Sequence, residues 1–177
     1  HGIGSLGLQL QYVDYGEIEE AIWAPPYNSD LNTPGLTGRT FRPYSYVVGL
    51  TYGTMITDKF STGLSVKYAH ESLYNDNEVV VTKYLPDTTT MKVKTWGNVF
   101  LFDYGIHYNT GYRTIEVGAS VQNFGPNVTY ADEDHPVPMA LRVGIAADIL
   151  GTNALLFQSD KSRLGIEFDL FQPNDYD

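Results

Sequence analysis

The chain has 177 residues, no cysteine and a formal net charge of −10 at pH 7. The lack of cysteine excludes disulfide bonds and thiolate metal sites, and the acidic balance argues against a nucleic-acid partner. No stretch approaches the roughly 18 consecutive apolar residues of a membrane helix. The mean hydropathy of −0.23 suits a soluble protein, but it also suits a transmembrane barrel, whose strands alternate lipid-facing and polar residues.

Seven segments alternate apolar and polar residues with a period of two, and no helical period persists over a long window. They lie at 5–12, 45–56, 60–70, 99–108, 114–123, 141–149 and 164–170. In the third segment Leu64 and Val66 share one face, while Ser65 and Lys67 share the other. Each segment is close to the roughly 9–11 residues with which a tilted strand crosses a bilayer.

The connections between these segments are alternately long and short. Turns or short links lie at 57–59, 109–113 and 151–162, and long polar connections lie at 16–44, 71–97 and 124–138. An up-and-down barrel with short periplasmic turns and long external loops produces this alternation. We therefore predict an all-β fold, an antiparallel up-and-down transmembrane β-barrel.

The polar face of the predicted strands is dominated by Gly, Ser and Ala, with isolated charges of both signs. These charges are Lys67, Asp103, Glu116, Arg142, Glu167 and Asp169. Small residues let a strand curve and leave room in a crowded interior. We predict a lumenal charge network from these six residues, which either pair for structural reasons or gate transport.

Aromatic residues near the strand ends fit the interfacial girdles of a membrane barrel. They are Tyr12, Tyr15, Phe60, Tyr68, Tyr108 and Tyr112. For any single tyrosine, the preference of tyrosine for strands is the better explanation, so only the set supports the prediction.

Seven strands cannot close an antiparallel single-chain barrel of the usual even-numbered kind. An open sheet would also leave unpaired backbone groups in lipid. We expect residues 1–177 to be one incomplete barrel domain, with strands missed by the pattern or a second chain as the alternatives. His1-Gly2-Ile3-Gly4 contains neither an initiator Met nor a signal peptide, so we also expect the true N-terminus to be missing.

Several segments taken together resemble the PorV/PorQ family of outer-membrane proteins, which is related to the FadL-type barrels. They are Val13–Glu19, Gly53–Tyr68, Gly97–Gly105, Tyr108–Arg113, Val121–Pro126 and Asp169–Asp175. The likeness extends over most of the chain and implies a larger barrel of roughly 14 strands, an even number as in other bacterial barrels. The family's small-residue-rich N-terminal region and its strands after the Gln172–Asp175 segment are absent.

The resemblance implies a function in protein secretion. Family members are associated with type IX secretion, as shuttle or attachment components that bind the translocon or cargo signal domains. The expected partners are membrane lipid and such a protein, in the bacterial outer membrane. Two alternatives stay open: a FadL-like transporter of hydrophobic small molecules, and a soluble β-sandwich binding module.

No enzyme signature is present, the family offers no catalytic motif to transfer, and we expect no cofactor. His70-Glu71 and the cluster Asp132-Glu133-Asp134-His135 are the candidate metal ligands. They lack the spaced ligands and the glycine of a calcium loop, so a solvated acidic loop is favoured over a metal site. Further acidic residues, such as Glu17, Glu19 and Glu20, lie in the long connections. We predict that the long connections, including Asp132, Glu133 and Asp134, form the partner surface.

The assignment of faces gives a stability prediction. Leu64→Arg should destabilise the protein by roughly 2–4 kcal/mol if this side faces the middle of the membrane. Ser65→Arg should instead be limited by the space on the polar side. Urea unfolding of both variants in lipid bilayers measures the difference, and equal tolerance of arginine at the two positions would contradict the assignment.

Overall fold

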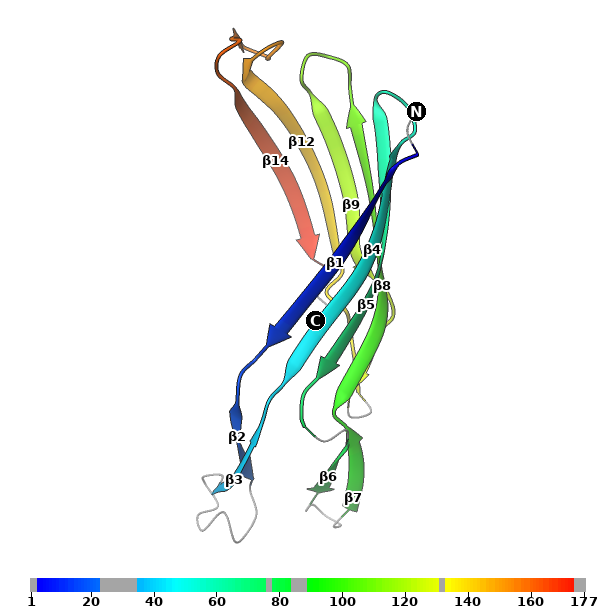
Figure 1. The fold of residues 1–177 in the computed structure, drawn as a ribbon, viewed down its shortest axis with the longest axis vertical. Helices are drawn as coiled ribbons and strands as arrows, with labels where there is room; N and C mark the ends of the chain where they lie inside the picture. Colours follow the sequence, from blue (N-terminus) through cyan, green and yellow to red (C-terminus); the bar gives the residue numbers. More distant parts are fainter. Residues whose placement is uncertain (1–2, 23–34, 76–77, 84–88, 131–132, 174–177) are drawn as a thin grey trace.

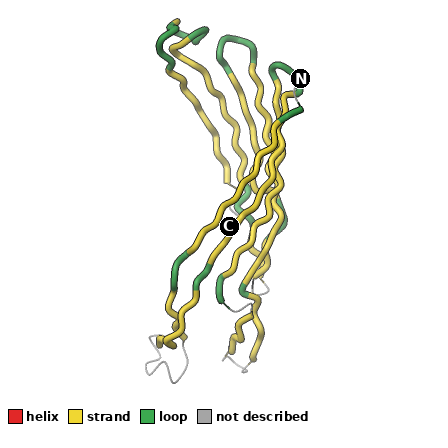
Figure 2. Tube along the Cα trace, viewed as in Figure 1, coloured by secondary structure: helices red, strands yellow, loops and turns green. Residues whose placement is uncertain are grey.

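A computed structural model describes residues 3–22, 35–75, 78–83, 89–130 and 133–173 of the chain (Figure 1). All the regular secondary structure in these residues is β-strand, as the tube in Figure 2 shows. The all-β prediction is therefore confirmed for the described part of the chain.

The seven predicted strands are all present and belong to one sheet. They are β1 (Ser5–Asp14), β4 (Tyr44–Met55), β5 (Phe60–Ser72), β8 (Trp96–Asn109), β9 (Glu116–Phe124), β12 (Ala140–Gly151) and β14 (Leu164–Pro173). An eighth strand, the two-residue β13 (Phe157–Gln158), pairs in parallel with the end of β12. The seven long strands follow one another across the sheet in chain order, each antiparallel to its neighbours. This is the up-and-down order that the alternating connections predict.

Each long connection contains a two-stranded hairpin that the alternation does not reveal. The hairpins are β2 (Ile18–Ile22) with β3 (Gly35–Phe41), β6 (Glu78–Lys83) with β7 (Thr89–Lys94), and β10 (Val128–Tyr130) with β11 (Glu133–His135). All three lie at one end of the main sheet, which we call the long-connection end. The opposite end, with the tight turn after β4, is the short-turn end (Figure 1).

The register separates the side chains onto two faces, which we call the apolar face and the polar face. On the apolar face, Leu8 pairs with Leu50, Leu50 with Val66, and Val66 with Phe102. These side chains are exposed, Leu8 by 80% and Leu50 by 55%. No second layer covers the apolar face in the described part of the chain.

Glycines form a row across the polar face. Gly53 pairs with Gly63, and Gly63 pairs with Gly105. A Cβ at any of the three would meet no atom closer than 3.6 Å, so the space above the row is open. Because the apolar face carries bulky side chains along this row and the polar face carries none there, the sheet bends toward the polar face.

The sheet is open within the described residues. β1 and β14 lie at its two edges and do not pair with each other. The structure therefore shows a curved antiparallel sheet rather than a closed barrel.

The buried apolar core is small and lies on the polar side of the sheet. It consists of Val99, Leu101 and Val137, against which Ala69 and Val128 pack. Val99 and Leu101 belong to β8, whereas Val137 follows β11. The segment between β9 and β12 therefore covers part of the polar face.

Candidate functional site

Among the hollows on the polar face, two lie toward opposite ends of the sheet. The hollow nearer the short-turn end measures about 610 Å³ and is lined by residues of β5, β8, β9, β12 and β14. The hollow nearer the long-connection end measures about 620 Å³ and lies between the sheet and the β10–β11 segment. The polar face is therefore the candidate functional surface.

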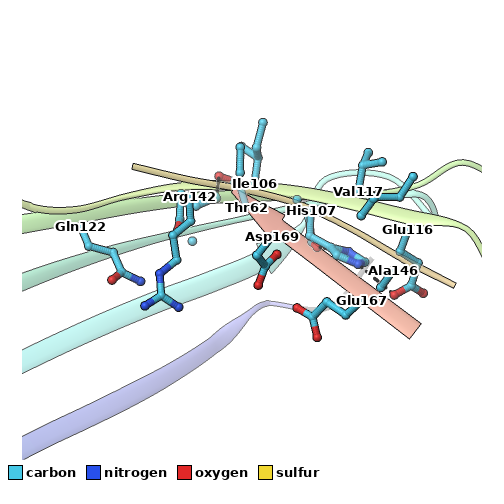
Figure 3. A pocket seen from close by; sticks show the side chains of 18 residues that line it. Thr62, Ile106, His107, Glu116, Val117, Gln122, Arg142, Ala146, Glu167 and Asp169 are labelled. Atoms are coloured by element: carbon cyan, nitrogen blue, oxygen red, sulfur yellow. Dashed lines mark hydrogen bonds and ion pairs between the residues drawn. The ribbon is translucent and has the colours of Figure 1, made fainter. Parts of the chain in front are cut away.

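Four of the six predicted charged residues line the first hollow. They are Glu116, Arg142, Glu167 and Asp169. Figure 3 shows them on one side of the sheet, while Ile106 and Val117 point away on the other. The glycine at position 144 makes room for Asp169, since a Cβ there would lie 1.9 Å from the Asp169 carboxylate.

In the described residues, these four charged side chains do not form ion pairs with one another. Glu116 pairs with His107, Nε2 to Oε2 at 3.2 Å, and both side chains are about half exposed. The Arg142 guanidinium lies 4.9 Å from the centre of the Phe171 ring. In the described residues no ion pair joins Arg142 to Glu167 or Asp169, so the predicted six-residue network is not formed as a unit.

Among the six predicted charges, Lys67 and Asp103 form an ion pair with each other. Lys67 is only 8% exposed, and its Nζ lies 2.7 Å from Asp103 Oδ1. The same ammonium donates to Asn123 Oδ1 at 2.5 Å. Asp103 also accepts the backbone N–H of Asn123 at 2.8 Å. The buried ammonium is thus compensated by a carboxylate and an amide oxygen, as a buried charge requires.

Asn123 is the central residue that the sequence pattern misses. The pairing of β8 with β9 shifts between Phe102 and Tyr104, so Gln122 and Asn123 both lie opposite Asp103. This is a β-bulge, and Asn123 adopts a positive φ of 56°, which asparagine tolerates better than most residues. The bulge turns Asn123 onto the polar face, where strict alternation would place it on the apolar one.

The β10–β11 hairpin lies on the same face. Val128 and Tyr130 pack over Gly97, and the Tyr130 hydroxyl donates to Glu71 Oε2 at 2.8 Å. Burial raises the pKa of the Tyr130 hydroxyl well above its ordinary value, and the hydrogen bond to Glu71 raises this pKa further. The hydroxyl therefore remains a proton donor at neutral pH.

The predicted acidic partner loop is described only in part. Asp132 lies outside the described residues, and the side chain of Glu133 is not described. Asp134 is exposed and accepts a hydrogen bond from Thr129 Oγ1 at 2.6 Å. The loop's role in binding stays a prediction.

The candidate metal ligands do not come together where the structure describes them. His70 lies on the apolar face among aromatic rings, whereas Glu71 lies on the polar face beside Tyr130. Adjacent residues of a strand point to opposite faces. The described residues contain no group of three His, Asp or Glu side chains that could hold a metal ion.

Acidic side chains at the long-connection end are held by hydrogen bonds. Glu17 accepts from Thr40 Oγ1 at 2.6 Å. Glu20 accepts from Thr37 Oγ1 at 2.5 Å and also from the Tyr74 hydroxyl. The bond from Thr37, followed by that from Tyr74, lowers the pKa of Glu20, so this carboxylate is ionised at neutral pH.

Aromatic rings cluster on the apolar face toward the long-connection end. The ring centroids lie 6.2 Å apart for Tyr12 and Tyr44, 5.1 Å for Tyr46 and His70, 5.3 Å for Tyr68 and Phe100, and 5.9 Å for His70 and Trp96. Phe60 and Tyr108 pair with each other near the short-turn end. Tyr15 does not join the apolar-face cluster, because it lines the second hollow and its hydroxyl lies 3.5 Å from Ser45 Oγ.

Comparison of the sequence with protein-family models finds no match, and comparison with curated proteins finds no significant similarity. The resemblance to the PorV/PorQ family accordingly stays a prediction. None of the described residues forms a helix of the length and apolarity needed to cross a membrane.

The Lys67–Asp103 pair gives a second stability prediction. Asp103→Ala should cost about 3 kcal/mol, because it leaves a buried ammonium without its countercharge. Adding Lys67→Met should recover part of this loss. His107→Ala, which breaks a half-exposed pair, is the matched control and should cost less than about 1 kcal/mol.

Urea unfolding of the protein refolded in detergent measures the change in stability of all three variants. Equal losses for Asp103→Ala and His107→Ala would contradict a structural role for the buried pair.

Proposed function

We propose that this chain forms part of the wall of a bacterial outer-membrane β-barrel that acts in protein secretion or surface attachment, as in the PorV/PorQ family. The apolar face carries the proposal. It extends across all seven long strands, and its side chains remain exposed on every one of them, including Leu8, Leu64, Phe102, Val143 and Phe168. Lipid acyl chains are the solvent that such a surface fits.

The position of the buried core supports lipid over a protein layer on this face. A soluble sandwich buries the apolar faces of two sheets against each other. Here the one cluster of buried apolar side chains in the described residues lies on the polar side, under Val137. The soluble-sandwich alternative would require a covering layer on the opposite face.

The aromatic cluster supports the same environment. Tyr, Trp and His rings gather at one end of the apolar face, with Leu and Val side chains between them and the short-turn end. The Lys94 ammonium lies 3.7 Å from the centre of the Trp96 ring, an amphipathic pairing suited to a membrane–water interface. This pairing supports a membrane interface near Trp96.

The secretion role rests on the resemblance of the sequence and on the surface at the long-connection end. The hydrogen bonds of Glu17 and Glu20 fix the β2–β3 hairpin, and Tyr74 joins it to the next long connection by packing 4.8 Å from the Phe41 ring. Ordered acidic loops of this kind can present a preformed surface to a translocon or to a cargo signal domain.

A second candidate function is transport of hydrophobic small molecules in the manner of FadL. The hollow of about 620 Å³ favours it, because apolar Val47, Val99 and Leu101 lie in its lining beside polar groups. Ligand sites of this size commonly combine an apolar lining with a few polar groups.

Affinity capture after mild-detergent extraction of native membranes tests the proposal. We expect the full-length protein in the outer-membrane fraction, together with a large translocon identified by mass spectrometry. Recovery alone with lipid-like ligands would favour transport instead, and recovery without detergent would refute the membrane barrel.

Two variants with the same charge change locate the partner surface. Glu19→Lys lies on the β2–β3 hairpin at the long-connection end, whereas Asp160→Lys lies in the link at the short-turn end. We expect Glu19→Lys to reduce partner recovery several-fold and Asp160→Lys to leave it unchanged. Equal recovery with both variants would exclude the β2–β3 hairpin as the contact.

A further inference from the structure

The connection between β9 and β12 folds back over the polar face. A Cβ at Gly97 would lie 2.6 Å from Val128 Cγ1 and 2.6 Å from Tyr130 Cε1. The Tyr130 hydroxyl reaches across to Glu71 on the neighbouring strand β5. Since Gly97 and Glu71 are paired polar-face positions, the hairpin lies against the inner surface of the proposed wall.

Apolar packing holds the part of this connection that leads from β11 to β12. Val137 is 7% exposed, and it packs with Val99 and Leu101, which are 8% and 7% exposed. These three residues form the buried cluster of the described chain. Displacing the connection would expose all three, so the inward position is the stable one.

A hydrogen bond anchors the end of the connection to the wall, and a close backbone approach holds its start. Asn123 Nδ2 donates to the Pro138 carbonyl at 3.1 Å, while Asn123 Oδ1 accepts from Lys67. At the start of the connection, a Cβ on Gly125 would lie 2.6 Å from the Phe100 carbonyl oxygen. The backbone therefore approaches β8 as closely as glycine permits.

The other two hairpins behave differently. β2–β3 and β6–β7 extend away from the main sheet at the long-connection end (Figure 1). In the short-turn half, the polar face is lined by residues such as Gly63, Gly118 and Ser120 and is hollow. The connection thus occupies space at one level of the proposed lumen only.

We propose that this connection, residues 125–130 and 133–139, is an inward-folded constriction that narrows the barrel lumen at the long-connection end. The inference rests on the proposed function, because a lumen exists only where the wall closes into a barrel. Passage of solutes through the barrel is then set by this connection rather than by the glycine-lined half.

Thiol accessibility tests the position of the constriction. The chain has no native cysteine, so a single introduced thiol reports one site. Val99→Cys lies beneath the connection, and Ser120→Cys lies on the same face in the open half. In the full-length protein in lipid nanodiscs, we expect a bulky water-soluble maleimide to label Ser120→Cys several-fold faster than Val99→Cys. Equal labelling rates would overturn the proposal.

A glycine substitution then displaces the connection. Gly97→Leu places a side chain where Val128 and Tyr130 lie, whereas the nearest atom to a Cβ at Gly118 is the Ile106 carbonyl at 3.5 Å. We expect Gly97→Leu to accelerate labelling of Val99→Cys several-fold and to raise ion conductance in planar bilayers. The control Gly118→Leu should do neither. Slow labelling and unchanged conductance in the Gly97→Leu protein would overturn the proposal.

Membrane fractionation of every variant separates these outcomes from failure of the barrel itself, which would appear as protein recovered without detergent.

Discussion

The antiparallel register is the constraint on which the rest of the structure depends. It keeps Leu8, Leu50, Val66 and Phe102 in one row, with each residue paired to the next across four strands. A slip of one residue in any strand would move its apolar side chains to the polar face. The long strands keep this register except at the β8–β9 bulge and near the end of β12. One face of the sheet is therefore apolar from edge to edge, and the other carries glycine, serine, charges and the small buried cluster.

The sequence predicted the seven strands because burial imposes a period of two that is visible in the residues themselves. It did not predict the hairpin strands, since β10 and β11 have only three residues each, too few to show a period. The run of β-branched residues Val79-Val80-Val81, with Val93 opposite Val79 in the next strand, was a usable signal for β6 and β7. The six charges were correctly assigned to one face, but their pairing depends on distances between strands.

The bulge at Asn123 satisfies the Lys67–Asp103 pair apart from the other four charges. It brings a single amide beside Lys67 and Asp103, so this pair is satisfied locally. The same amide binds the Pro138 carbonyl, and one irregular residue thereby connects β5, β8 and the segment before β12. Alternation predicts regular strands only. A residue that departs from the alternation through a positive φ is therefore recognised in the structure and not in the sequence pattern.

The glycine row gives the sheet a spontaneous curvature. The polar face has almost no side-chain volume along the row of Gly53, Gly63 and Gly105. The aromatic and aliphatic side chains on the apolar face take up much more space. A sheet with bulky side chains on one face and glycine on the other bends toward the glycine. The direction of this bend is therefore set by side-chain volume and does not depend on a contact between the first strand and the last.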